Sequence, residues 1–334
     1  MPTRHKNRPR TIDIHAHYYP RPYLDLIAAE GQRFNATYRM TETGFSFDTP
    51  GGAGASMPMK FIDLGERLAE MDRARVDVQV LSLSQPMVYW ADADLSHRLA
   101  RAWNDGASAA HLAHPDRLFA LMTLPMLDRD RALDELNRAA HLPGIRGVYL
   151  GTNIDGRDLD DPIFEPIFER IAQLDLPVFL HPIQPLGGKR LDFFLMHNAL
   201  GFTFDTAIAA CRLIFGGVLD RHPMLKVNLP HAGGVLPILT GRIDHAYRIT
   251  DAPKRIAQPP SAYLKRFTYD TITHSAPILE WVISRVGISR VMLGSDFCFP
   301  MGTDRPVKLV DQLGLDQRQR SLILGSTAAK LLRL

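Results

Sequence analysis

The stretch Thr11-Ile-Asp-Ile-His-Ala-His-Tyr18 predicts a short strand with two histidines at its carboxyl end. Side chains at alternate positions of a strand point to the same face. We therefore expect His15 and His17 to project together, with Ala16 turned the other way. Two imidazoles in this arrangement suit two ligands of one metal ion, but histidine pairs without a metal can have the same spacing. The remainder of the chain decides between these interpretations.

The chain beyond residue 60 alternates regularly between helix and strand patterns. Seven further strands are predicted at residues 76–84, 119–125, 145–151, 177–182, 225–231, 267–272 and 291–296. Strands that alternate with amphipathic helices imply a parallel sheet. Eight such units predict an α/β fold of the (β/α)8 TIM-barrel type, whose active site lies at the carboxyl ends of the strands. A doubly wound open sheet is the alternative, disfavoured because no Gly-x-Gly-x-x-Gly follows the first strand.

Residues from about 32 to 60 interrupt this pattern. Aromatic side chains alternate there and precede the glycine-rich stretch Pro50-Gly-Gly-Ala-Gly-Ala-Ser56. This combination predicts a small β-hairpin insertion after the first strand, with a flexible loop that serves as a lid. The whole chain, residues 1–334, is expected to be a single barrel domain with a basic tail at residues 1–10 and extra helices at its carboxyl terminus.

The composition narrows the class of protein. Of the 334 residues, 46% are hydrophobic, which is ordinary for a globular protein with a large core. The net charge of +3 is too small to indicate nucleic acid or a membrane surface as a partner, and no apolar run is long enough to span a bilayer. The two cysteines, Cys211 and Cys298, have no motif spacing, so we expect no disulfide framework and a cytoplasmic protein.

Metal-binding side chains gather at the ends of the predicted strands. His15 and His17 end the first strand, His181 the fifth, His231 the sixth and Asp296 the eighth. In a barrel these ends lie together on the face where catalysis takes place. Imidazole and carboxylate groups are typical ligands of a borderline divalent ion such as Zn²⁺, which keeps an open position in catalytic sites.

The motifs that contain these side chains resemble a known family. They are His15-Ala-His17, Phe179-Leu-His-Pro182, Pro230-His-Ala-Gly-Gly234 and Leu293-Gly-Ser-Asp296. Together they resemble the amidohydrolase superfamily, and within it the decarboxylase branch. That branch includes the α-amino-β-carboxymuconate-ε-semialdehyde, 6-methylsalicylate and γ-resorcylate decarboxylases. The likeness extends over nearly the whole chain.

The resemblance implies a role for each of the five side chains. His15, His17, His181 and Asp296 would bind one divalent ion, zinc or alternatively manganese, and His231 with Asp296 would form the catalytic pair. A second metal in this superfamily usually needs a carboxylated lysine at the end of the fourth strand. Residues 145–151 contain no lysine, so a mononuclear site is expected. A homodimer is also expected from the resemblance.

A carboxylic acid substrate requires a cationic partner and, where it is aromatic, flat apolar neighbours. Arg190 and Arg248 follow the fifth strand and the sixth helix, and are candidates for binding the carboxylate. Trp90 and Phe297 are candidates for contacting a flat substrate. The two arginines that the resemblance to the semialdehyde decarboxylase implies are not matched here, because residues 54–59 contain no arginine and residue 250 is a threonine.

The predicted function is metal-dependent, non-oxidative decarboxylation of a small aromatic or muconate-like carboxylic acid, with His231 as the acid and base. The same groups could instead hydrolyse a lactone or an amide, or hydrate a small unsaturated acid. A barrel that has lost its activity is a further alternative. It is disfavoured because all five site residues are present.

Overall fold

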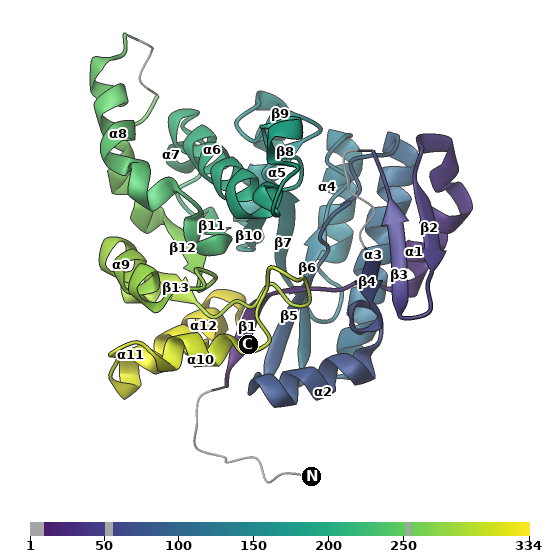
Figure 1. Cartoon of the computed structure of the whole chain (residues 1–334). Helices are drawn as coiled ribbons and strands as arrows, with labels where there is room; N and C mark the ends of the chain where they lie inside the picture. The colour runs from purple at the N-terminus through teal and green to yellow at the C-terminus, as the bar shows by residue number, and fades with distance from the viewer. Residues whose placement is uncertain (1–9, 51–55, 252–254) are drawn as a thin grey trace.

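A computed structural model describes residues 10–50, 56–251 and 255–334 (Figure 1). Eight parallel strands form one sheet, in which each strand pairs with the next one along the chain. They are β1 (Ile12–His17), β5 (Val78–Ser82), β6 (Leu118–Thr123), β7 (Ile145–Gly151), β10 (Pro177–His181), β11 (Lys226–Leu229), β12 (Phe267–Asp270) and β13 (Val291–Met292). The backbone N–H of Ile14 donates to Leu293 O at 2.9 Å, which joins the last strand to the first. The predicted (β/α)8 barrel is therefore confirmed.

Helices follow the strands along the chain and cover the outside of the barrel. They are α1 (Arg21–Glu30), α2 (Leu64–Ala74), α3 (Ala93–Ala113), α4 (Arg129–Ala139), α5 (Glu165–Gln173), α6 (Phe202–Phe215), α7 (Val218–Arg221), α8 (Leu236–Ile249), α9 (Ala276–Val286), α10 (Pro306–Asp311), α11 (Gln317–Ser321) and α12 (Thr327–Leu332). Aspartates start four of them, because the side chains of Asp63, Asp92, Asp128 and Asp316 accept backbone N–H groups of the first turn. Within the described residues, none of the helices has the length and apolarity needed to cross a membrane.

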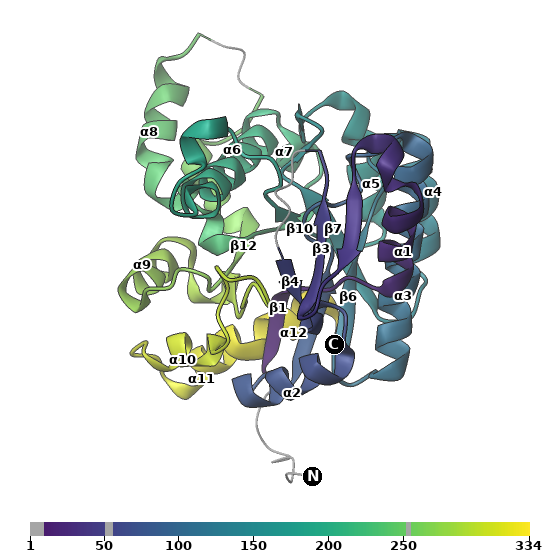
Figure 2. The same cartoon turned by 45° about the vertical axis from the view of Figure 1, so that its right-hand side comes forward.

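The insertion after β1 is larger than the predicted hairpin. Three antiparallel strands form it, β2 (Thr37–Met40), β3 (Gly44–Asp48) and β4 (Ser56–Pro58), and the sheet stands beside α1 (Figure 2). Phe45 and Phe47 of β3 are buried against Tyr19, with ring centroids 5.8 and 5.4 Å away. The predicted hairpin is formed by β2 and β3, and the third strand was missed because β4 has only three residues, too few for a visible alternating pattern.

Two other differences concern segments that sequence patterns describe poorly. A short hairpin follows β7, formed by β8 (Asn153–Ile154) and β9 (Arg157–Asp158), and it was not predicted. Its two-residue strands are too short for a periodic signal. The predicted flexible loop and basic tail fall largely on residues 51–55 and 1–9, which lie outside the described residues.

The carboxyl-terminal helices pack against the start of β1. Leu293 N donates to Ile323 O at 2.9 Å, and Gly325 lies directly against the backbone of Arg10. A side chain at residue 325 would displace this backbone, since its Cβ would lie 1.9 Å from Arg10 O. The absence of a side chain at Gly325 thus lets the carboxyl-terminal helices pack directly against the backbone that precedes β1.

We predict that Gly325→Ala destabilises the protein, because the added methyl group must push the chain away from Arg10. Overpacking of this kind lowers the free energy of unfolding by about 1–3 kcal/mol, which urea denaturation measures. Gly314→Ala is the matched control, since among the described residues nothing lies within 4 Å of its added carbon. Equal stability of the two variants would contradict the packing described.

Candidate metal centre

Four side chains from three distant parts of the chain meet at the carboxyl ends of the strands. They are His15 and His17 at the end of β1, His181 at the end of β10, and Asp296 after β13. All four are buried, and one ligand atom from each lies within 4.8 Å of the other three. Nε2 of His17 is 3.2 Å from Nε2 of His15 and 3.0 Å from Oδ1 of Asp296. The group has the composition and spacing of a divalent-metal site.

Hydrogen bonds on the outer side of each ring fix which nitrogen faces the centre. Nδ1 of His15 donates to Oδ2 of Asp270 at 2.8 Å, and Nδ1 of His181 donates to Pro182 O at 2.8 Å. Nδ1 of His17 lies 3.1 Å from Oγ of Ser82, whose hydroxyl donates to the carbonyl of Ala16. With Nδ1 protonated in each ring, three Nε2 lone pairs converge on one point.

This convergence is the test of whether the residues fit a metal ion. Three lone pairs and a carboxylate oxygen directed at one another repel unless a cation lies between them. Outer acceptors that fix the tautomer of ligating histidines are typical of protein metal sites. Three nitrogens and one oxygen suit a borderline ion and leave a position open for a substrate or water.

Burial controls the charge of the ligands. It lowers the pKa of His17 to about 4 and holds the pKa of His181 well below its ordinary value. Burial also opposes the charged form of His15, but Asp270 and Asp296 outweigh it, so the pKa of His15 is raised. For Asp296 burial favours the neutral acid, yet the neighbouring imidazoles of His17, His231 and His15 hold its pKa well below its ordinary value. The carboxylate is therefore ionised, and the imidazoles of His17 and His181 are neutral at neutral pH.

His231 lies beside the four ligands. It follows β11, its Nε2 is 3.9 Å from Oδ2 of Asp296, and its side chain is 13% exposed. Its Nδ1 is buried and has no hydrogen-bond partner among the described residues. The ring centroids of His15 and His181 are 5.4 and 5.5 Å away. An imidazole so close to the centre is in reach of a bound substrate as an acid or base.

Three aromatic rings surround the histidines. Phe299 lies 5.2 Å from His17, Tyr149 lies 5.8 Å from His181, and Phe202 stacks on His231 at 6.5 Å between ring centroids. The sequence analysis did not single out these residues. Phe299 and Tyr149 lie near strand ends, a signal that could have found them, whereas Phe202 begins a helix and carries no such signal.

A buried polar network lies behind β1. Asp13 accepts hydrogen bonds from Ser295 N at 3.0 Å, Ser295 Oγ at 2.5 Å and Gln79 Nε2 at 3.1 Å. Gln79 in turn accepts from Nη1 of the fully buried Arg67 at 2.9 Å, and Arg67 also donates to the carbonyl of His17. The network contacts Ser295, next to Asp296, and the carbonyl of His17. Buried hydrogen bonds therefore hold the backbone beside both ligands.

The four predicted substrate-binding residues lie in different surroundings. Arg190 is exposed in the short helix Gly188–Leu191, and Arg248 is exposed in the last turn of α8. Trp90 donates through Nε1 to Met87 O at 3.2 Å. The ring of Phe297 lies 4.8 Å from the guanidinium carbon of Arg67, beside the network behind β1. Their part in substrate binding stays a prediction.

Comparison with known proteins agrees with this geometry. The model of the Amidohydrolase family matches residues 12–334. The chain belongs to this family. A 2-amino-3-carboxymuconate-6-semialdehyde decarboxylase of Dictyostelium discoideum is 33% identical over 272 residues, which are 80% of this chain and 76% of the relative. A gamma-resorcylate decarboxylase of Rhodococcus jostii is 27% identical over 310 residues, covering 85% and 92% of the two chains.

Solved structures agree in the fold. The 5-carboxyvanillate decarboxylase of Sphingomonas paucimobilis superposes with a TM-score of 0.83 at 28% identity, covering 97% of this chain and 99% of the other. The amidohydrolase resemblance predicted from the strand-end motifs is thus confirmed, and these relatives are carboxy-lyases.

We predict that His181→Ala lowers bound zinc well below one ion per chain, because it removes one of four converging ligands. Elemental analysis of the purified protein after dialysis measures the content. His197→Ala is the matched control, since this histidine lies next to Phe202, at 5.5 Å, and outside the ligand group. Full zinc content in the His181 variant would refute the ligand set.

We also predict that zinc affinity falls as the solution becomes acidic. Below its raised pKa, His15 carries a proton that the ion must displace before it can bind. Each pH unit below that pKa therefore weakens binding by about tenfold from this group alone. Competition titrations with a chelator at several pH values measure the slope, after correction for protonation of the chelator. An affinity independent of pH across neutrality would contradict the prediction.

Proposed function

We propose that this protein is a metal-dependent decarboxylase that removes CO₂ non-oxidatively from a small aromatic or muconate-like carboxylic acid. One observation carries the proposal. Three buried imidazoles and a buried carboxylate converge at the carboxyl ends of the strands with a fourth imidazole beside them, in a chain whose relatives over most of its length are decarboxylases. Hydrolysis of a lactone or amide and hydration of an unsaturated acid use similar groups, but these relatives do not support them.

The resident ion we propose is zinc, held by His15, His17, His181 and Asp296. Three imidazole nitrogens favour zinc, and manganese is the alternative that the carboxylate would accept. When bound, the ion supplies Lewis-acid chemistry, which stabilises negative charge developing on a substrate oxygen.

His231 supplies the proton. In its charged form, Nε2 gives a proton to the substrate carbon that bears the carboxylate, and Asp296 stabilises the charged imidazole from 3.9 Å. The bond to the carboxylate then breaks, its electron pair returns to the ring or diene, and CO₂ leaves. His231 regains its proton from solvent through its partly exposed edge. The ring of Phe202 lies nearly parallel to the imidazole, at 6.5 Å between ring centroids.

We predict that His231→Gln lowers the rate of CO₂ release by a factor on the order of 10²–10⁴, the usual contribution of a positioned acid or base. Bound zinc should remain near one ion per chain, because His231 lies outside the four-ligand group. The assay incubates zinc-loaded protein with a panel of hydroxybenzoates and carboxymuconate semialdehydes and measures CO₂.

Two outcomes would contradict this assignment. Turnover of lactones or amides by the wild-type protein, with no CO₂ from any acid, would replace decarboxylation with hydrolysis. Loss of zinc from the His231 variant would make His231 a ligand.

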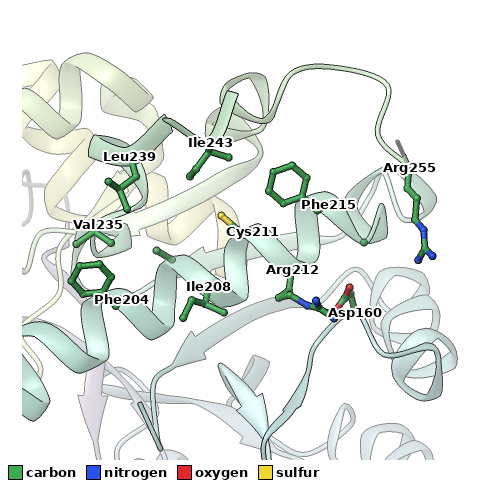
Figure 3. A pocket seen from close by; sticks show the side chains of 12 residues that line it. Asp160, Phe204, Ile208, Cys211, Arg212, Phe215, Val235, Leu239, Ile243 and Arg255 are labelled. Carbon is green, nitrogen blue, oxygen red and sulfur yellow. The ribbon is translucent and has the colours of Figure 1, made fainter. Parts of the chain in front are cut away.

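We further propose that the partners are a small carboxylic acid and a second copy of the chain, with no role for nucleic acid or a membrane. Large apolar side chains are exposed around α6 and α8, namely Phe193, Phe194, Leu195, Leu200, Phe204, Ile238 and Ile249. Side chains of α6 and α8 face each other across an adjoining groove of about 600 Å³ (Figure 3). Exposed apolar side chains beside an apolar groove are typical of protein–protein contact sites, which supports association through this face.

We predict that Ile238→Glu shifts the protein from dimer to monomer, because a charge at the centre of an apolar interface loses its water without gaining a partner. Sedimentation analysis measures the mass. Leu112→Glu on α3 is the matched control, since the two side chains are 67% and 64% exposed in the single chain. A wild-type protein that sediments as a monomer would contradict the proposed association.

A further inference from the structure

Asp270 ends β12 and is fully buried, yet it is neither a metal ligand nor a proton donor in the scheme above. Its carboxylate accepts four hydrogen bonds. Oδ2 accepts from Nδ1 of His15 at 2.8 Å and from the backbone N–H of His231 at 2.9 Å. Oδ1 accepts from the backbone N–H of Ala232 at 2.8 Å and of Ile272 at 3.0 Å. One carboxylate thus contacts both the metal ligand and the turn that carries the proposed acid.

That turn has an unfavourable backbone conformation. His231 and Ala232 have φ values of 52° and 55°, in the left-handed region that residues with a Cβ rarely adopt. Consecutive residues in this region persist only where their surroundings hold them. The N–H groups of both residues donate to Asp270, so this carboxylate is placed to hold the turn.

We propose that Asp270 is a positioning residue that couples the two halves of the centre. Through His15 it fixes the direction of a metal ligand. Through the two backbone amides it fixes the place of the His231 imidazole relative to Asp296. The second role rests on the proposed function, because it concerns proton transfer by His231.

The substitution Asp270→Asn tests these contacts. Both oxygens of the carboxylate accept hydrogen bonds, whereas an amide has only one accepting oxygen. If the amide NH₂ replaces Oδ2, the N–H groups of His15 and His231 lose their acceptor. If it replaces Oδ1, His15 keeps its acceptor, but the N–H of Ala232 faces another donor. One amide of the turn therefore loses its partner in either orientation.

Two readouts independent of turnover test the proposal. Zinc affinity of Asp270→Asn, measured by chelator competition, is expected to fall by about 10–100-fold, because in either orientation of the amide His15 loses the charged outer partner that makes it a more basic ligand. Hydrogen exchange of the zinc-saturated protein is expected to speed up in the peptide that contains His231 and Ala232. Turnover at saturating zinc should also fall, which a loss of metal affinity alone would not cause.

A second variant tests the role of the strained turn directly. Glycine adopts positive φ without strain, so Ala232→Gly should stabilise the turn without help from Asp270. The double variant Ala232→Gly, Asp270→Asn is expected to regain turnover several-fold at saturating zinc, while its zinc affinity stays weak. No recovery would overturn the proposed link between Asp270 and His231.

The matched control is Glu135→Gln, which makes the same chemical change at a buried carboxylate in α4. It removes an acceptor of Asn104 and Arg138, far along the chain from the centre, and should leave zinc affinity and exchange of the turn unchanged. Unchanged zinc affinity and exchange in Asp270→Asn would refute the proposal.

A third variant applies if Asp270→Asn does not fold. Gly294→Ala keeps the carboxylate but places a methyl carbon 2.8 Å from Cβ of Asp270 and 3.2 Å from Cβ of His15. Zinc binding should weaken through either contact, so faster exchange of the turn is the readout that reports on Asp270. Unchanged exchange there would overturn the proposal. Absence of CO₂ release by the wild-type protein would reject the proposed function alone, because metal affinity and exchange still decide the role of Asp270.

Discussion

The backbone pairing between β1 and the segment after β13 is the constraint on which the metal centre depends. Ile14 N donates to Leu293 O at 2.9 Å, and His17 N donates to Phe297 O at 2.6 Å. These bonds close the barrel and bring Asp296 to within 3.0 Å of His17, although 279 positions separate the two residues. Parallel pairing aligns the carboxyl ends of all strands, so closure also sets the distance from β1 to His181 and His231.

Burial at the end of the closed barrel determines which of these groups carry protons. Burial keeps the pKa of His17 at about 4 and that of His181 well below its ordinary value, so both rings present lone pairs instead of protons. Because the three rings are buried, each outer nitrogen requires a hydrogen-bond acceptor, and Asp270 and Pro182 provide two of them. The same contacts that satisfy buried polar atoms therefore orient the ligands.

The candidate metal ligands and the aromatic rings around them come from different parts of the fold. The four metal-binding groups come from strand ends, which the barrel holds rigidly. The rings nearest to them, Tyr149, Phe202 and Phe299, come from a strand, a helix and a loop. This division lets related barrels share a metal centre while their loops and helices differ. It accords with relatives whose names give a common reaction on different acids.

The sequence by itself determined the eight-fold alternation, the barrel and the five side chains of the centre. Whether a residue ends a strand can be predicted from the sequence around it. Because a parallel barrel places the carboxyl ends of all its strands on one face, residues at those ends lie close together. Only the tertiary structure decided the third strand of the insertion, the hydrogen bonds that Asp270 accepts from His15 and from the turn at His231, and the aromatic rings near the histidines. Those features depend on side-chain direction and on backbone amides in a left-handed turn, and neither has a periodic signal in the sequence. The same reason explains why Phe297 could be predicted near the centre, while the structure was needed to show its ring against Arg67.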